Sequence, residues 1–420
     1  MSDKKTIVRT ATELVDAVSN SSIATIVVQG HIDGVPSLQL SPGQSLEGAD
    51  TESTIRFALH QDGLQLTTSN SITGLRLEAS MTHRAIYNST EVESLGTLHL
   101  HDVTTTGQVQ ILVRDKVRSG HLEVMGLDVI SADTRGQTDR PQGFGVHVIQ
   151  GAFTLWNMQA DSSVVVTAEL TGLSAGRPAK PVIGSGIFVS GPGFGEGALS
   201  VSRLETDAVY SDGKIDAGTA DVITGGVFTV YGAYVDLVHN YGPVVTYGVN
   251  DMALDNWGKV DRWVAEDKVT TYGASGIGFV NFGSLGWLHV KAPIETFGQG
   301  SRGFNLYAGS VNEAVFDRIS THADGAVGVQ ISQPMGTLKV LRGIETFGGT
   351  GDSLVKGKVM RLSAIGLSIK PGAALDEVCI EGGLTTHGSN VVPLEVHDQI
   401  GVLHIEGGIR CQNAPEEKKD

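Results

Sequence analysis

The sequence predicts an all-β chain folded as a parallel β-helix, a solenoid of about 25 residues per coil. Three observations predict this fold class. A pentapeptide of the type "IETFG" recurs at a fixed spacing, short segments such as "LHLHDV" and "LHIEGG" alternate apolar and polar residues, and 55 glycines punctuate a chain with few helix signals.

The spacing of the pentapeptide identifies the kind of solenoid. Its copies begin at Val244, Val269, Ile294, Ile319 and Ile344 in steps of 25 residues, then at Leu384 after 40 and at Ile409 after 25. Three other repeat classes do not fit the sequence. Helical repeats would show an apolar period of about 3.6 residues, and leucine-rich repeats would show their characteristic leucine pattern. Each blade of a propeller would need about 40 residues and four strands. A parallel β-helix fits, because three short strands make one coil and neighbouring coils pair at about 4.8 Å.

Positions within the pentapeptide predict which side chains enter the core. The first and third positions share one face of a strand; the first is aliphatic and the third is threonine in the first six copies, so both are expected to point inward. The second position is polar or mixed and is expected to point outward. The fourth is also expected outward, and it carries Tyr247, Tyr272, Phe297, His322, Phe347 and His387. This ring ladder could be structural, covered by a loop or a partner subunit, or it could bind sugar rings through Tyr247, Tyr272 and Phe297.

The N-terminal segment predicts a cap on the first coil. Thr10 and Glu13 form a capping box for a helix over "ATELVDAVS", and "ATIVVQGHI" at 24–32 is expected to be the first strand. This entry resembles the right-handed parallel β-helix proteins of the pectate-lyase-like superfamily, where a short helix caps the first coil. The resemblance implies a right-handed β-helix. The pectate-lyase tryptophan-containing signature and paired-arginine motif are not found, so neither a catalytic arginine nor a calcium site is carried over.

The repeat favours one domain over 1–412, with the cap and first strand in 1–30 and a tail at 413–420 that is expected to be disordered. Surplus residues, rich in Gly, Pro and charge, fall within 134–221. Solenoids place insertions on loops, often at the binding face, so these middle coils are the expected functional region.

Composition excludes several function classes. The chain has 30 Lys and Arg against 46 Asp and Glu, a formal charge of −16, and no basic stripe, so neither nucleic acid nor an anionic membrane is expected as a partner. No signal peptide or apolar membrane span is visible, which predicts a cytoplasmic protein. Two cysteines exclude a disulfide framework and a cysteine zinc site, and no cofactor is predicted.

Candidate catalytic residues come from extending the columns upstream. Strand motifs beginning at Leu98, Leu122, Phe153 and Leu199 are interpreted as one column, with steps of 24, 31 and 46. This alignment places Asp161 and Asp207 in the fourth, outward column, and Glu205 and Asp128 in the second. Stacked coils would hold two such carboxyls about 5 Å apart, the separation of a retaining glycosidase pair, whereas a diagonal pair would suit an inverting one. The alternative is a solvated acidic face.

Other polar residues give weaker signals. Arg140 and Arg177 lie in the long loops and could bind a carboxylated sugar or simply solubilise the loops. His99 and His101 have a spacing compatible with metal ligation, but the sequence identifies no third ligand, so no metal site is predicted.

These features predict a carbohydrate-active enzyme, a glycoside hydrolase or intramolecular glycosyl transferase with an Asp/Glu pair on the middle coils. One alternative is a polysaccharide lyase. Another is a non-catalytic β-solenoid that binds a glycan or assembles with itself. The expected partner is an oligosaccharide or polysaccharide, and self-association through a solenoid face, as in a trimer, is a further expectation.

Overall fold

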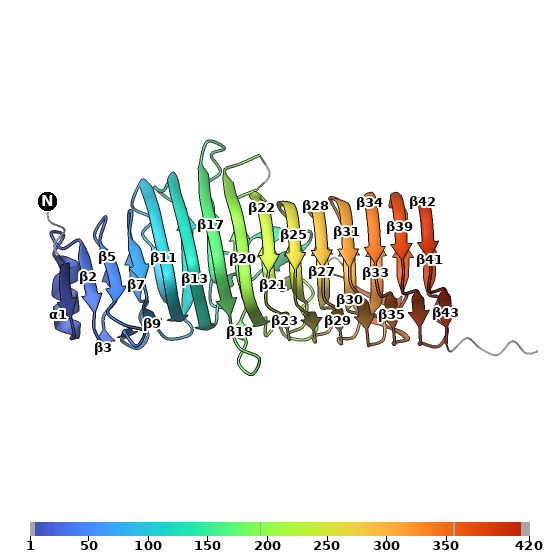
Figure 1. Ribbon diagram of the computed structural model, residues 1–420, viewed down its shortest axis with the longest axis horizontal. Coiled ribbons are helices and arrows are strands. Elements are labelled where there is room, and N and C mark those ends of the chain that lie inside the picture. The colour runs from blue at the N-terminus through green and yellow to red at the C-terminus, as the bar shows by residue number, and fades with distance from the viewer. Residues whose placement is uncertain (1–4, 194, 356–357, 413–420) are drawn as a thin grey trace, which may run out of the picture. The chain divides into compact units, whose positions relative to one another are not determined.

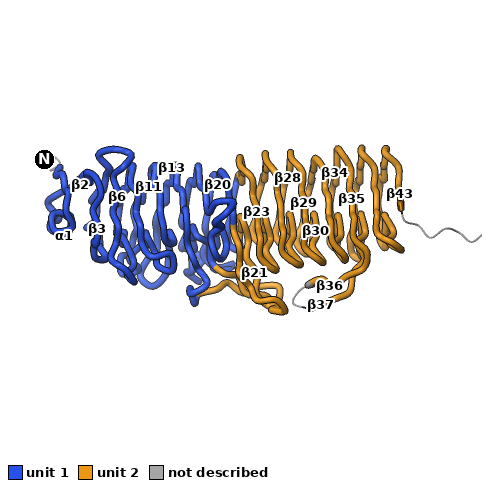
Figure 2. Tube along the Cα trace, turned by 90° about the horizontal axis from the view of Figure 1, so that it is seen from below, with its two compact units in different colours: residues 1–138, 150–210, 230–236 blue, residues 139–149, 211–229, 237–420 orange. Residues whose placement is uncertain are grey.

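A computed structural model describes residues 5–193, 195–355 and 358–412 (Figure 1), so the predicted tail at 413–420 lies outside the described residues. Contacts group the chain into two compact units (Figure 2). Unit 1 comprises Met1–Thr138, Gln150–Tyr210 and Val230–Asp236, and unit 2 comprises Asp139–Ile149, Ser211–Thr229 and Leu237–Asp420. The sequence predicts one domain over 1–412, and that assignment stays a prediction.

Unit 1 begins with a strand and a capped helix. Strand β1 (Lys5–Val8) precedes α1 (Ala11–Ser19) and pairs in parallel with β2 (Thr25–Val28), so the first strand lies ahead of the predicted one. The Thr10 side chain accepts a hydrogen bond from the Glu13 N–H, and the Glu13 carboxylate accepts one from Arg9, which confirms the capping helix. Within the described residues, no helix has the length and apolarity needed to cross a membrane.

The other strands of unit 1 form two parallel sheets. The first sheet contains β3 (His31–Val35), β5 (Ser45–Gly48), β6 (Thr54–Phe57), β8 (Ser71–Thr73), β9 (Arg76–Glu78), β11 (Ser94–Thr106), β13 (Ser119–Ser131), β17 (Val165–Ala175) and β18 (Val182–Ile183). The second contains β4 (Leu38–Gln39), β7 (Leu64–Leu66), β10 (Arg84–Asn88), β12 (Gln108–Val113), β16 (Gly151–Asn157) and β19 (Ser185–Ser190). Strands β20 (Ala198–Asp212) and β22 (Ala233–Asn240) include residues of both units.

Unit 2 repeats the same arrangement with more regular coils. Its first sheet contains β23 (Val244–Thr246), β25 (Lys259–Ala265), β26 (Val269–Thr271), β28 (Ser284–Val290), β29 (Ile294–Thr296), β31 (Ser310–Phe316), β32 (Ile319–Thr321), β34 (Met335–Val340), β35 (Ile344–Thr346), β39 (Leu375–Ile380), β40 (Leu384–Thr386), β42 (Ile400–Ile405) and β43 (Ile409–Cys411). Its second sheet contains β21 (Val222–Thr229), β24 (Asp251–Asn256), β27 (Ile277–Asn281), β30 (Arg302–Leu306), β33 (Val327–Ile331), β38 (Leu367–Ile369) and β41 (Leu394–Val396). The strands pair in parallel from coil to coil, which confirms the predicted parallel β-helix.

The pentapeptides pair as the repeat predicts. Val244 lies opposite Val269, which lies opposite Ile294, and the register continues without a slip to Ile409. The aliphatic residues of the first position are at most 1 % exposed in the first six copies, and the threonines of the third are fully buried. Each coil therefore buries the same two side chains of the pentapeptide, which is why the sequence repeats.

Two antiparallel hairpins depart from the coil pattern in unit 2. One joins β14 (Gln142–Gly143) to β15 (Val146–Val148), and the other joins β36 (Thr350–Val355) to β37 (Lys358–Ser363). The second hairpin accounts for the step of 40 residues between Ile344 and Leu384, because it adds an excursion to one coil.

Candidate functional site

The predicted pair of Asp161 and Asp207 does not form. Phe153, on which the alignment depends, lies in β16 of the second sheet, opposite Val109 and Ile187, so placing it in the column of Leu98 and Leu122 was wrong. Asp161 instead occupies the turn before β17, where its carboxylate accepts hydrogen bonds from the N–H and hydroxyl of Ser163 at 2.9 and 2.7 Å.

The register of β17 with β20 sets a lower limit on the separation of these aspartates. Val165, just after the turn of Asp161, lies opposite Ala198, whereas Leu173 lies opposite Thr206, the residue before Asp207. Eight residues of strand at about 3.3 Å each span more than about 20 Å. Carboxyls that act on one glycosidic bond lie within about 10 Å of each other, so these two cannot share a bond.

The other predicted acids of unit 1 are held in ion pairs. Asp128 accepts hydrogen bonds from Arg177 at 2.9 and 2.5 Å, and the bond raises the pKa of the guanidinium. Glu205, 8 % exposed, forms a short ion pair with Arg203. The structure thus brings together Asp128 and Arg177 as an interlocked pair, while Arg140 lies half-buried in unit 2.

The predicted ring ladder is present in unit 2. Successive ring centroids are 5.4, 5.1, 4.5, 4.9 and 4.4 Å apart from Tyr247 to His387, and neighbouring planes lie within 13° of parallel. Tyr272 and Phe297 are 49 and 39 % exposed, which confirms that this column points outward. Both faces of each of these two rings are covered by their neighbours in the ladder. Since a sugar stacks on a free ring face, the geometry favours the structural interpretation for Tyr272 and Phe297.

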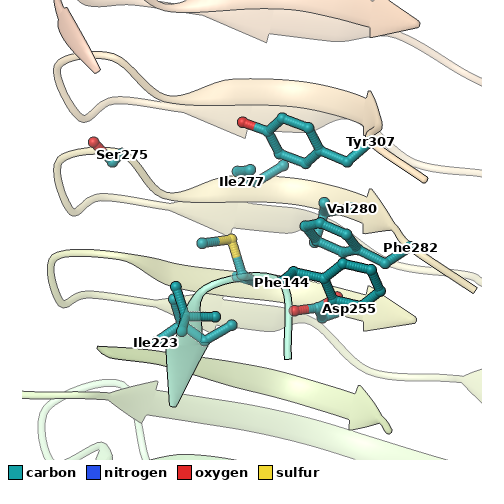
Figure 3. Close-up of a pocket in the computed structure, with 10 residues that line it drawn as sticks. Phe144, Ile223, Asp255, Ser275, Ile277, Val280, Phe282 and Tyr307 are labelled. Carbon is teal, nitrogen blue, oxygen red and sulfur yellow. The ribbon is translucent and has the colours of Figure 1, made fainter. Parts of the chain in front are cut away.

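A small cavity of about 40 Å³ lies against the second sheet of unit 2, and aromatic and aliphatic side chains form most of its lining (Figure 3). Phe144 borders it from the β14–β15 hairpin. Phe144 and Gly145 have φ values of 52° and 85°, and positive φ at both turn residues is the requirement of a tight type I′ hairpin. Strand β15 pairs in parallel with β21, which anchors the hairpin beside the sheet.

Aromatic rings form much of this Phe144 cavity. The ring of Phe144 is 4.4 Å from that of Phe282 and 5.1 Å from the indole of Trp257, and Phe282 stacks on Tyr307 at 5.1 Å. Phe144 keeps 36 % of its surface exposed, although most of the aromatic cluster is buried. A bulky residue with positive φ is strained, and such strain is characteristic of ligand clamps.

One carboxyl group lines the Phe144 cavity. Asp255, on β24, is fully buried, and neither of its oxygens accepts a hydrogen bond of standard geometry from the described residues. Burial raises its pKa well above the ordinary value of 3.8, outweighing an interaction with the Trp257 indole that lowers it. Burial therefore favours the neutral form of this carboxyl group, which can donate one hydrogen bond and accept others.

A second cavity adjoins the first. It has a volume of about 220 Å³, lies between the loop around Gly218 and the β36–β37 hairpin, and shares Ser275 with the Phe144 cavity. Its lining is mixed: alanine and valine side chains alternate with polar residues, Thr219, Gln299 and Asp352 among them. We call the two cavities together the unit 2 groove; the β14–β15 hairpin borders its first cavity and the β36–β37 hairpin its second.

A second fully buried acid lies on the same strand as Asp255. Asp251, also on β24, accepts hydrogen bonds from Gly213 N–H at 3.0 Å, from Gly248 N–H at 2.7 Å and from the Thr224 hydroxyl. Burial raises its pKa to about 7, although these hydrogen bonds lower it, and the charge of Asp212 adds to the rise.

The 25-residue repeat of the sequence could have identified Asp255 as an unusual residue. "ALDNW" from Ala253 precedes "GFVNF" from Gly278 by 25 residues, so Asp255 occupies the position of Val280 and then of Asn305. Carrying the second column one coil upstream would have exposed an acid at an otherwise apolar or neutral position. Phe144 could not have been identified in this way, because its hairpin does not belong to the 25-residue repeat.

A scan against protein-family models and searches of curated proteins and of solved structures returned no match for this chain.

Proposed function

We propose that the chain binds an oligosaccharide along the unit 2 groove, with one sugar ring lying against Phe144 and one of its hydroxyls entering the Phe144 cavity. The observation that carries the proposal is Asp255, a buried carboxylic acid without a standard hydrogen-bond partner in an aromatic cavity. Buried polar groups almost always make hydrogen bonds of good geometry, so a carboxyl at a cavity wall whose contact with the Trp257 indole falls short of that geometry indicates a place for a ligand group.

Sugar chemistry matches both parts of this cavity. A sugar ring has apolar C–H faces and a rim of hydroxyls, so the exposed part of Phe144 supplies a surface for a face, and the Asp255 carboxyl supplies a donor and an acceptor for a hydroxyl. Further sugar units would meet the polar lining of the second cavity at Gln299 and Asp352. The expected cytoplasmic location favours short oligosaccharides.

Glycoside hydrolysis or glycosyl transfer is the second candidate, favoured by the raised pKa of Asp255. A carboxyl held protonated by an apolar site is the usual general acid of a glycosidase. Asp161 and Asp207 are not part of this candidate, because they lie too far apart to act on one glycosidic bond. A polysaccharide lyase would need a cation to neutralise a uronate, and the described residues that line the two cavities include no Lys or Arg.

Two substitutions at Asp255 separate binding from catalysis. Binding of a panel of labelled oligosaccharides is measured by fluorescence anisotropy, and release of reducing ends by a colorimetric assay. We expect Asp255→Leu to weaken binding by roughly 5- to 100-fold, because a hydroxyl of the sugar loses its partner. Asp255→Asn should preserve binding and abolish any hydrolysis, since an amide can hydrogen-bond but cannot protonate a leaving group.

Phe144→Ala is expected to weaken binding as well, whereas Asp376→Asn, an exposed acid on β39 of unit 2 that lines neither cavity, is the matched control and should change nothing. Unchanged affinity in both Asp255→Leu and Phe144→Ala would overturn the proposal, as would a panel in which no oligosaccharide binds. The remaining alternative, self-association, would appear as a concentration-dependent mass in sedimentation experiments with no effect of either substitution.

A further inference from the structure

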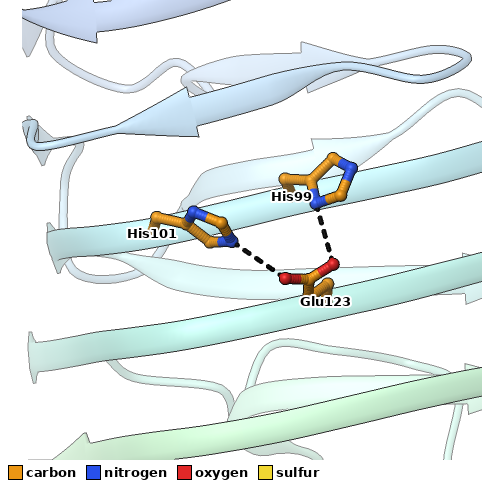
Figure 4. A group of neighbouring side chains, drawn as sticks. All are labelled: His99, His101 and Glu123. Carbon is orange, nitrogen blue, oxygen red and sulfur yellow. Dashed lines mark ion pairs between the residues drawn. The ribbon is translucent and has the colours of Figure 1, made fainter.

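Two histidines and a glutamate of unit 1 converge on one point of the first sheet. His99 and His101 lie on the same face of β11 because they are two residues apart, and Glu123 lies on β13, directly opposite His99 in the register (Figure 4). The third ligand that the sequence lacked thus comes from the next coil. All three side chains are between 27 and 37 % exposed, so the point is accessible from solvent.

The distances are those of a metal site. His99 Nδ1 lies 3.1 Å from Glu123 Oε2 and His101 Nε2 lies 3.4 Å from Glu123 Oε1, and one ligand atom from each residue lies within 4.8 Å of the others. A tetrahedral cation with bonds of about 2.0 to 2.1 Å holds its ligand atoms about 3.3 Å apart. Small rotations of these side chains would therefore complete the coordination.

His101 directs its Nε2 at the same carboxylate, 3.4 Å from Glu123 Oε1 (Figure 4). Its Nε2 is buried and makes no hydrogen bond of standard geometry among the described residues, although the carboxylate lies near it. The neighbouring His121, two residues before Glu123 on β13, has its Nδ1 2.7 Å from the Thr167 hydroxyl and is thereby occupied. A buried nitrogen that faces a carboxylate without making a hydrogen bond of standard geometry is placed as a metal ligand would be.

We infer that His99, His101 and Glu123 bind a divalent transition-metal cation of the Zn²⁺ class. Two imidazole nitrogens with one carboxylate form a ligand set that Zn²⁺ accepts, and three protein ligands leave a coordination position for water or a substrate oxygen. The cation would also cross-link β11 to β13, so binding would stabilise two neighbouring coils of unit 1.

The test is isothermal titration of the full chain, freed of metal by a chelator, with Zn²⁺ alone. We expect one Zn²⁺ per chain at this site and a rise in melting temperature with added metal. Glu123→Gln should weaken the affinity by about 10- to 100-fold or more, and His99→Ala combined with His101→Ala should abolish it, each without changing the circular dichroism of the fold.

A rival pair must be controlled for. Cys379 lies opposite His404 on the neighbouring strands β39 and β42 of unit 2, and a thiol with an imidazole also attracts Zn²⁺. His404→Ala is therefore the matched control and should leave the titration unchanged. Cobalt substitution reports the ligands directly: a spectrum without a thiolate charge-transfer band supports the inference. Zn²⁺ binding that survives in the double histidine variant, or that disappears in His404→Ala, would overturn it.

Discussion

The substitution Asp251→Asn should make the chain more stable at neutral pH than it is with aspartate. Asp251 is fully buried, and its pKa is raised from 3.8 to about 7 chiefly by burial. The folded chain keeps this proton between about pH 4 and pH 7, whereas the unfolded chain releases it. The contribution of Asp251 is therefore most favourable below about pH 4 and is lost as the pH rises to about 7.

The size of the effect follows from this difference. About 3 pH units at about 1.4 kcal/mol each correspond to about 4 kcal/mol. Asparagine mimics the neutral acid: its carbonyl oxygen can accept the bonds from Gly213 and Gly248, and its amide can donate to the Thr224 hydroxyl. The variant should match the parent near pH 4 and exceed it by up to about 4 kcal/mol near pH 8.

Urea unfolding followed by circular dichroism, over a pH series, measures this difference. Asp324→Asn serves as the control, because Asp324 is exposed and its carboxylate accepts a bond from Gly349 at 2.7 Å rather than from the groups around Asp251. The other titratable groups are the same in the parent and the variant, so their contributions cancel in the stability difference between the two. A stability difference between Asp251→Asn and the parent that is the same near pH 4 as near pH 8 would refute the reasoning about this carboxyl.

Three further predictions concern the scaffold, each read from urea unfolding. Phe297→Ala should cost about 2 to 3 kcal/mol, because the ring stacks on both neighbours; a cost below about 0.5 kcal/mol would show that the ladder is not structural. Thr321→Val should lower the free energy of unfolding by about 1 to 2 kcal/mol, because it removes a buried hydroxyl that donates a hydrogen bond at 2.7 Å to the Ala326 carbonyl. Thr246→Val should be neutral or stabilising, because the Thr246 hydroxyl has no hydrogen-bond partner among the described residues. Equal effects of the two substitutions would contradict this reasoning. Burial raises the pKa of Glu395, but hydrogen bonds, first from Lys370, lower it to about 2. The contribution of Glu395 to folding stability is therefore present above about pH 4 and is lost as the pH falls to about 2. Glu395→Gln should lower the free energy of unfolding by about 1 to 3 kcal/mol at pH 7 and leave it unchanged near pH 2.

The sequence was sufficient for the fold of unit 2 because every coil there solves the same packing problem. A side chain that enters the coil at Ile294 stacks on Val269 and Ile319, so the residue type recurs at the coil length. The same logic exposed the ring ladder before its geometry was seen. Where the coil length is constant, sequence spacing is equivalent to spatial stacking.

In unit 1 the sequence spacing does not predict which residues stack, because the coil length varies. Leu122 follows Leu98 by 24 residues, but its next partner in the register, Ala168, follows by 46. A strand from another sheet, β16, alternates in the same way and carries Phe153 into the wrong column. Alternation tells which side chains are buried, but not to which sheet a strand belongs. The false pair of Asp161 and Asp207 followed from this ambiguity.

The alignment of Leu98 with Leu122 was nevertheless right, and it already implied that His99 and Glu123 are neighbours. The third ligand candidate for the histidine pair lies on the next coil, not on the strand that carries the histidines. In a solenoid, the nearest residue outside the strand lies one coil away, at about 4.8 Å. Candidate sites in such chains are therefore better sought down the columns than along the sequence.

Column comparison also explains why Asp255 stands apart from the scaffold. The same position holds Val280 on the next coil, where an aliphatic side chain packs without any polar cost. A buried carboxyl that makes no hydrogen bond of standard geometry costs about 1 to 3 kcal/mol, and more if it is ionised. The fold gains nothing from this acid that valine would not supply at lower cost. The ring ladder, by contrast, stabilises the coils that carry it. Function is therefore best sought where a column breaks at an energetic cost to the fold, and in unit 2 that place is the wall of the Phe144 cavity.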